Sequence, residues 1–85
     1  MRFLTTSTLK APPTAEVQAL MPAELAKVKE LTEQGLVSAF YIAADRSGAW
    51  MVWNVDSQAA LEETLNTLPL HPYLNSEITV LAEEM

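Results

Sequence analysis

Leu65-Asn66-Thr67-Leu68-Pro69-Leu70-His71-Pro72-Tyr73 is the stretch around which the rest of this chain is organised. Pro69 and Pro72 each fix φ and lack a backbone N–H, so neither a helix nor a central strand can run through them. The residues that precede them, Leu68 and His71, are expected to be extended. The stretch therefore predicts a rigid ledge that ends a helix and leads into a last strand.

The rest of the chain divides into strands and helices. Segments rich in β-branched and aromatic residues predict strands, and apolar residues at three- and four-residue steps predict helices. Lys10-Ala11-Pro12-Pro13 should end the first strand, and Pro22 should either kink the first helix or start a second segment. The expected strands are Phe3–Leu9, Leu36–Ala43, Trp50–Val55 and Glu77–Ala82; one helix runs from Thr14 to Gly35, and another follows Asp56-Ser57 with Leu61, Leu65 and Leu68 on its apolar face.

The order β-α-β-β-α-β predicts an α+β, ferredoxin-like fold in one domain, residues 1–85. Four antiparallel strands would carry two helices on one face, and the other face should be polar if it meets water. Both faces of the central hairpin are apolar instead. Val37, Ala39 and Tyr41 are expected to oppose Phe40 and Ile42, and Trp50 and Val52 to oppose Met51, Trp53 and Val55. The outer face therefore predicts a homodimer that packs sheet on sheet.

Composition narrows the range of partners. The chain has 85 residues, of which 49% are hydrophobic, and no cysteine that could form a disulfide or a thiolate–metal site. A net charge of −6 with five scattered basic residues argues against nucleic acid and anionic membranes. No apolar run approaches the roughly 18 residues of a spanning helix, and the first residues are unlike a signal peptide. These features predict a soluble, cytoplasmic protein.

Glu24 and His71 are the candidates for acid–base chemistry. Glu24 lies beside apolar helix positions and close to Pro22, where a carboxyl group in an apolar pocket could carry a proton; the alternative is an ordinary solvated glutamate. His71 is the only histidine, and it could act as an acid or base, orient a substrate or ligate haem; the alternative is a histidine held sterically between two prolines. No second histidine or paired carboxylate stands at ligand spacing, so we expect no metal and no cofactor.

Aromatic residues and one arginine are the candidates for substrate binding. Tyr41, Trp53 and Tyr73, together with Trp50, could line a pocket for a flat apolar ligand, although aromatic residues on strands more often belong to a core or an interface. Arg46 follows Asp45 in the hairpin turn, where it could meet a substrate carboxylate or simply form a solvated pair.

From Gly35 to Leu81 the sequence resembles the muconolactone delta-isomerases, small enzymes of bacterial aromatic-compound breakdown. Leu68-Pro69-Leu70-His71-Pro72-Tyr73 followed by Glu77-Ile78-Thr79-Val80-Leu81 carries most of the resemblance, with weaker matches at Val55-Asp56-Ser57 and Gln34-Gly35. The resemblance implies a dimeric α+β barrel, often assembled into larger rings. It also implies cofactor-free proton transfer on an unsaturated lactone acid, with Glu24 at the place of a helix glutamate that acts as the acid/base.

Two departures from that family pattern concern the site. Ser47 and Ala49 stand where the family has a tyrosine and an asparagine in the hairpin turn, and His71 stands where it usually has a bulky apolar aromatic residue, whereas Arg46 matches an arginine. The sequence therefore leaves two main functions open: a cofactor-independent isomerase or lyase acting on a small lactone or related ring compound, or a ligand-binding or assembly module that has lost this chemistry. A third and remoter option, cofactor-independent oxygenation of a polycyclic phenol, rests on fold analogy alone.

Overall fold

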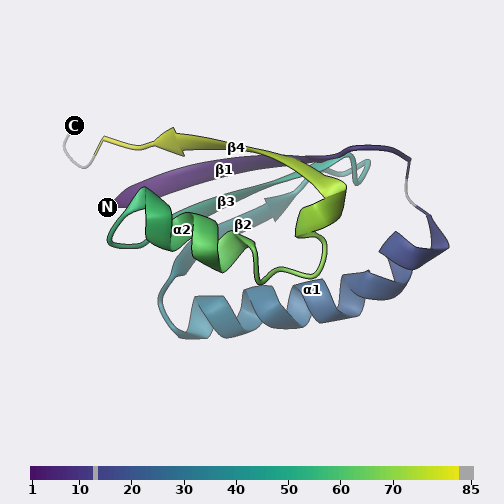
Figure 1. Cartoon of the computed structure of the whole chain (residues 1–85), viewed down its shortest axis with the longest axis horizontal. Helices are drawn as coiled ribbons and strands as arrows, with labels where there is room; N and C mark the ends of the chain where they lie inside the picture. The colour runs from purple at the N-terminus through teal and green to yellow at the C-terminus, as the bar shows by residue number, and fades with distance from the viewer. Residues whose placement is uncertain (13, 83–85) are drawn as a thin grey trace.

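Four strands and two helices follow one another in the predicted order (Figure 1). The computed structural model describes residues 1–12 and 14–82, so Pro13, part of the expected break after the first strand, lies outside the described residues. The elements are β1 (Arg2–Leu9), α1 (Ala15–Glu33), β2 (Val37–Ile42), β3 (Gly48–Asn54), α2 (Gln58–Leu65), the short 3-10 turn η1 (His71–Tyr73) and β4 (Leu74–Val80).

The strands form one antiparallel sheet in the order β2-β3-β1-β4. Both helices lie against the same face of this sheet, and no element of the described residues covers the other face (Figure 1). This arrangement is the ferredoxin-like α+β fold, which confirms the predicted fold class.

The helix boundaries follow from local chemistry. The Thr14 side chain accepts a hydrogen bond from the Val17 N–H at 3.2 Å, and Ser57 caps α2 in the same way, so each helix begins with a satisfied backbone donor. Gly35 follows α1 with a φ of 80°, a conformation that glycine adopts without strain. Among the described residues, no helix is long and apolar enough to cross a membrane.

Pro22 lies inside α1 and does not divide it into two helices. The first turns of the helix are nevertheless inclined to the remainder (Figure 1). A proline has no N–H to donate to the carbonyl of Gln18, four residues earlier, and its ring crowds that carbonyl, so a bend at this place is expected.

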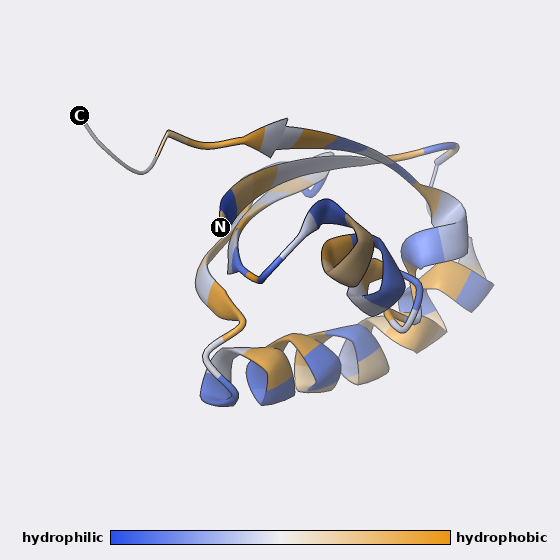
Figure 2. Cartoon of the chain, turned by 60° about the vertical axis from the view of Figure 1, so that its left-hand side comes forward, coloured by the Kyte–Doolittle hydropathy of each residue, from blue (hydrophilic) through white to orange (hydrophobic). Residues whose placement is uncertain are grey.

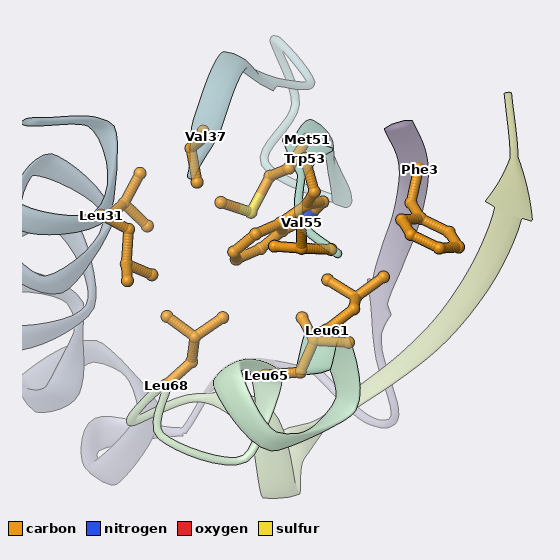
Figure 3. Close-up of a cluster of buried hydrophobic side chains, with 10 residues drawn as sticks. Phe3, Leu31, Val37, Met51, Trp53, Val55, Leu61, Leu65 and Leu68 are labelled. Carbon is orange, nitrogen blue, oxygen red and sulfur yellow. The ribbon is translucent and has the colours of Figure 1, made fainter. Parts of the chain in front are cut away.

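The hydrophobic core lies between the inner face of the sheet and the two helices. Hydrophobic and hydrophilic residues alternate along α1 (Figure 2), and its buried residues, Val17, Glu24, Val28 and Leu31, recur at helical spacing on one side. Side chains from β1, β3, α2 and the end of α1 point into one space, among them Phe3, Met51, Trp53, Leu61 and Leu31 (Figure 3). Trp53 is fully buried there, and its indole N–H donates to Thr5 Oγ1 at 2.9 Å, which satisfies two buried polar groups at once.

The stretch ends α2 and leads into the last strand, as predicted, but the extended geometry expected at His71 is wrong. His71 lies in the 3-10 turn η1, where the N–H of His71 donates to the Leu68 carbonyl and that of Tyr73 to the Leu70 carbonyl. Pro72 fits the first turn because the N–H that it lacks needs no partner there. The turn leads directly into β4, which starts at Leu74, three residues before the predicted Glu77.

A bulge in β2 corrects the predicted face of Val37. The pairing with β3 shifts between Val37 and Ala39, so Val37 opposes Trp53 and is buried in the core, whereas Tyr41 opposes Trp50 on the outer face. Tyr41 is 65% exposed and Trp50 40% exposed in the single chain. The outer face is therefore apolar along β2 and β3, as predicted.

Candidate active site

A cavity of about 390 Å³ lies between the first half of α1 and the inner face of the sheet. Its walls are mostly apolar, and they include Val17, Met21, Phe40, Ile42, Met51 and Leu70. A few polar side chains also line it: Ser7, Gln18, Glu24, Arg46, Ser47 and Ser76. An apolar chamber of this size with a few convergent polar groups is the usual form of a small-molecule site.

Glu24 is the one buried carboxylate among the described residues, with 8% of its surface exposed. Its Oε1 accepts a hydrogen bond from the Leu70 backbone N–H at 3.0 Å. Among the residues that the structure describes, none donates a hydrogen bond to Oε2. Burial raises the pKa of the Glu24 carboxyl above its ordinary value, and the Leu70 hydrogen bond and the charge of His71 only partly oppose that effect.

The phase of α1 brings Glu24 into the cavity. Val17, Glu24, Val28 and Leu31 are the buried residues of this helix, and steps of seven, four and three residues keep them on one side. Pro69 and Pro72 hold Leu70 and His71 in tight turns. The backbone hydrogen bonds of these turns do not use the Leu70 N–H, so this donor is available to Glu24. Sequence reasoning identified Glu24 but not its partner, since backbone donors leave no signal in the residue pattern.

Two serines on the sheet also line the cavity. Ser7 and Ser76 are paired across β1 and β4, and their hydroxyl oxygens lie 3.0 Å apart. One hydroxyl donates to the other, so one O–H remains to donate to a bound molecule. Sequence reasoning missed this pair, although the alternation of β1 places Ser7 on the same face as the buried Phe3 and Thr5.

The hairpin between β2 and β3 supplies the positive charge of the site. Arg46 adopts a φ of 65°, and the Asp45 carboxylate beside it accepts from the N–H and the hydroxyl of Ser47 at 3.0 and 2.6 Å. Those two hydrogen bonds lower the pKa of the exposed Asp45 carboxyl. Gly48 closes the turn against β1, where a Cβ would lie 2.9 Å from the Ser7 carbonyl oxygen.

His71 is not part of the lining of the main cavity. It borders a second cavity of about 350 Å³, together with Glu62, Leu65, Asn66, Ser76 and Ile78. The two cavities share the lining residues Leu65 and Ser76. The His71 Nδ1 is buried and has no hydrogen-bond partner among the residues that the structure describes.

The structure separates the three aromatic residues predicted to bind substrate from the main cavity. Trp53 is fully buried in the core, and Tyr41 lies on the outer face of the sheet. The Tyr73 hydroxyl donates to Glu16 Oε1 at 2.5 Å, outside the cavity lining. Of the predicted site residues, the structure brings Glu24 and Arg46 together in one cavity, with His71 beside Glu24.

No group of three or more histidine, cysteine, aspartate or glutamate residues in residues 1–12 and 14–82 is arranged to hold a metal ion.

Comparison with known proteins places this fold and cavity in a family. The family model described as muconolactone delta-isomerase matches residues 1–84. The chain belongs to the muconolactone delta-isomerase family. Comparison with the curated proteins finds no match.

Two solved structures resemble this family member. A muconolactone isomerase crystal structure superposes with a TM-score of 0.84 and 29% sequence identity, covering 99% of this chain and 91% of the other. A 5-chloro-2-hydroxyhydroquinone dehydrochlorinase from Burkholderia phenoliruptrix AC1100, in complex with 2,5-dihydroxybenzoquinone, superposes with a TM-score of 0.78 at 14% identity, covering 99% of this chain and 96% of the other. The second comparison shows a shared fold alone.

Proposed function

We propose that this protein is a cofactor-independent isomerase that moves a proton, and with it a double bond, within muconolactone or a closely related unsaturated lactone acid. The observation that carries the proposal is Glu24: a carboxyl group buried in an apolar cavity, with a raised pKa and one oxygen available for a proton. Family membership supports the reaction class.

The chemistry follows from the two states of one carboxyl group. In its ionised form, Glu24 takes a proton from a carbon α or γ to the lactone carbonyl, and the electron pair of that C–H bond spreads through the conjugated system as a dienolate. The neutral Glu24 then returns the proton to the other carbon, which shifts the double bond and restores the carboxylate. The raised pKa suits both steps, since an acid and its conjugate base must exchange roles near the working pH.

Other groups of the cavity would hold the reacting molecule. The Ser7–Ser76 pair offers one hydroxyl donor for an oxygen that becomes more negative as the dienolate forms. Arg46 in the cavity lining offers a cation for the acid group of the substrate. The apolar walls keep water from the intermediate.

The test is turnover of muconolactone by the purified protein, followed by ultraviolet absorbance and by NMR of the product. Glu24→Gln keeps an acceptor for the Leu70 N–H but cannot accept a proton, so kcat should fall by roughly 10²–10⁴-fold. Glu33→Gln, an exposed carboxylate change on the same helix, is the matched control and should leave kcat unchanged. Full turnover by Glu24→Gln would reject the acid/base role.

A non-catalytic ligand-binding module is the second candidate. Ser47 and Ala49, which depart from the family pattern, both line the main cavity, so the departures change the site itself. A binder would take up muconolactone in isothermal titration calorimetry without converting it. Binding without product in the wild-type protein favours this candidate, and measurable conversion excludes it.

The homodimer is a further part of the proposal. Tyr41 and Trp50 are cross-strand neighbours on the uncovered outer face, with the partly buried Ala39, Val52 and Leu4 beside them. An apolar sheet face of this kind is normally covered by a second layer, and an identical copy supplies one without any other partner.

A further inference from the structure

The polar groups of the main cavity divide into a buried set and one exposed cation. Glu24 and Ser7 are buried, Ser76 is partly buried, and Arg46 is an exposed residue of the hairpin turn. Arg46 is the one cation in the described lining of this cavity. No hydrogen bond or ion pair between described residues joins its guanidinium group to Glu24 or to either serine. The groups that would move a proton are therefore separate from the group that would bind an acid.

Glu24 can take a proton from a bound molecule without help from Arg46. Its Oε1 accepts from the Leu70 N–H at 3.0 Å, which fixes the carboxyl group in the wall of the cavity. Among the described residues, His71 Nδ1 is the one side-chain polar atom that is both shielded from solvent and without a hydrogen bond. Glu24 Oε2 has no described donor either, so it is accessible to solvent from the cavity that Glu24 lines.

The remaining walls of the cavity suit an uncharged ring. The side chains of Phe40, Ile42 and Met51 are apolar, and burial of a small ring against them is favourable without any charge. The Ser7–Ser76 pair keeps one O–H for an oxygen of that ring. A lactone can make these contacts whether or not it carries an acid group.

We propose that the main cavity also isomerises neutral β,γ-unsaturated five-membered lactones, which carry no acid group, because Glu24 and the serine pair act on the ring alone. Arg46 then sets the preference for acidic over neutral lactones. The inference rests on the proposed function for the class of reaction, and it extends the substrate class beyond lactone acids. A suitable probe is α-angelica lactone, whose ring carries a single methyl group.

The reaction balances without a co-reactant. Ionised Glu24 takes one proton from the ring carbon between the carbonyl and the double bond, and the electron pair of that C–H bond spreads into a dienolate with its charge on the former carbonyl oxygen. The free serine hydroxyl donates to that oxygen. Neutral Glu24 then returns the proton to the γ carbon, which brings the double bond into conjugation with the carbonyl and restores the carboxylate.

The first experiment follows α-angelica lactone by 1H NMR in the presence of the purified protein. The wild type should convert it to the conjugated isomer, β-angelica lactone, faster than buffer does at the same pH. Glu24→Gln, shown to be folded by its dispersed amide spectrum, should lower the rate by roughly 10²–10⁴-fold. Glu33→Gln, an exposed change on the same helix, should match the wild type. A wild-type rate equal to that of buffer would overturn the inference, as would full activity of folded Glu24→Gln.

The second experiment compares kcat/KM for muconolactone and for α-angelica lactone in the same variants. Arg46→Gln removes the one cation of the described lining, so the ratio of the muconolactone value to the α-angelica lactone value should fall by roughly tenfold or more. Arg2→Gln, at the opposite end of β1 from Ser7, is the control and should keep the wild-type ratio. An unchanged ratio in Arg46→Gln would overturn the inference.

The two substrates distinguish this inference from the proposed function. Conversion of α-angelica lactone without conversion of muconolactone would defeat the proposed substrate and support the inference. Conversion of muconolactone alone would overturn the inference and leave the proposed function in place. Conversion of neither lactone would defeat both.

Discussion

Ionisation of Glu24 lowers the stability of the folded chain, because a buried carboxyl group costs less free energy when neutral than when charged. Its oxygen has one backbone donor, Leu70, which orients the group without matching the solvation that water gives a free carboxylate. The protein therefore keeps a group that opposes folding when it is ionised. Such a conflict between local stability and reactivity is typical of catalytic positions.

The pH dependence of unfolding tests this conflict. Burial raises the pKa of Glu24 in the folded chain, so its contribution to stability is fully present below the unfolded value near 4.5 and is lost as pH rises through the folded value. Glu24→Gln removes the titration, and at pH 7 it should be more stable than the wild type by about 1 kcal/mol. Urea unfolding of both proteins from pH 3.5 to 7.5 measures the difference.

The lowered pKa of Asp45 has the opposite sign, since its contribution is present at neutral pH and lost on acidification. It is common to both proteins and cancels in the comparison. A difference that stays constant across this pH range would contradict a raised pKa at Glu24.

Arg46 gives a second prediction at the scale of one residue. If it pairs with the acid group of the substrate, Arg46→Gln should raise KM by roughly tenfold or more, the value of one charge-assisted hydrogen bond, with a smaller effect on kcat. Steady-state kinetics on muconolactone measure both. Arg2→Gln, at the opposite end of β1 from Ser7, is the control. A loss confined to kcat would place Arg46 in the chemistry instead of in binding.

α1 is a capped helix whose backbone hydrogen bonding is interrupted at one proline. Thr14 caps it, Gly35 follows its end, and Pro22 interrupts its hydrogen bonding two residues before Glu24. The first turns, which are inclined to the rest of the helix (Figure 1), carry Val17, Gln18 and Met21 of the lining of the main cavity. The element therefore contributes to the site through its shape as well as through its side chains.

Pro22→Ala separates these contributions. Alanine restores the N–H that the Gln18 carbonyl lacks, so the variant should be more stable by about 1–3 kcal/mol in urea unfolding. A straighter helix would move Glu24, so kcat on muconolactone should fall by roughly tenfold or more. Lys29→Ala, an exposed change in the same helix, should alter stability by less than about 0.5 kcal/mol. A variant with unchanged stability and turnover would show that the bend serves neither.

At the scale of elements, the residue pattern predicted the order and type of every strand and helix, since periodicity and end signals are local. It failed at His71, because two prolines forbid a long helix but still permit a 3-10 turn. Whether that turn forms depends on the Leu70 N–H that it leaves for Glu24, a contact between distant parts of the chain. It also failed at Val37, because an inserted residue in β2 changes which side chains face inward.

The whole molecule has one covered and one bare sheet face. The helices bury the inner face, whereas Tyr41 and Trp50 remain exposed on the outer one. On the same face, the β1–β4 half carries polar residues such as Thr8, Asn75 and Glu77. On the outer face the apolar residues are therefore concentrated on β2 and β3, with Leu4 of β1 beside them, and a second copy would have to make its main contact there.

Trp50→Glu tests that contact. A charge in the centre of the apolar patch should weaken self-association by roughly a hundredfold, which sedimentation velocity at micromolar concentration would show as a shift toward the monomer. Lys29→Glu, on the exposed side of α1, should leave the distribution as in the wild type. A wild-type protein that sediments as a stable monomer would refute the homodimer.

At this scale, the sequence predicted the fold and the bare apolar face, but only part of the candidate site. Glu24 and Arg46 were found because charged residues in unusual positions are visible in a sequence. Trp53 and Tyr41 were expected in the pocket, yet one lies in the core and the other on the outer surface. Aromatic residues occur in a pocket, in a core and on an interface face alike. Only the register of the strands decides which of these environments a given aromatic residue enters.

Leu65 and Ser76 line both the mostly apolar main cavity and the more polar second one. Leu65 also belongs to the hydrophobic core, so its replacement by alanine would enlarge the space beside both cavities at the expense of core packing. The larger space would accept bulkier ligands with one apolar and one polar end, which makes Leu65 the natural starting point for redesigning ligand specificity.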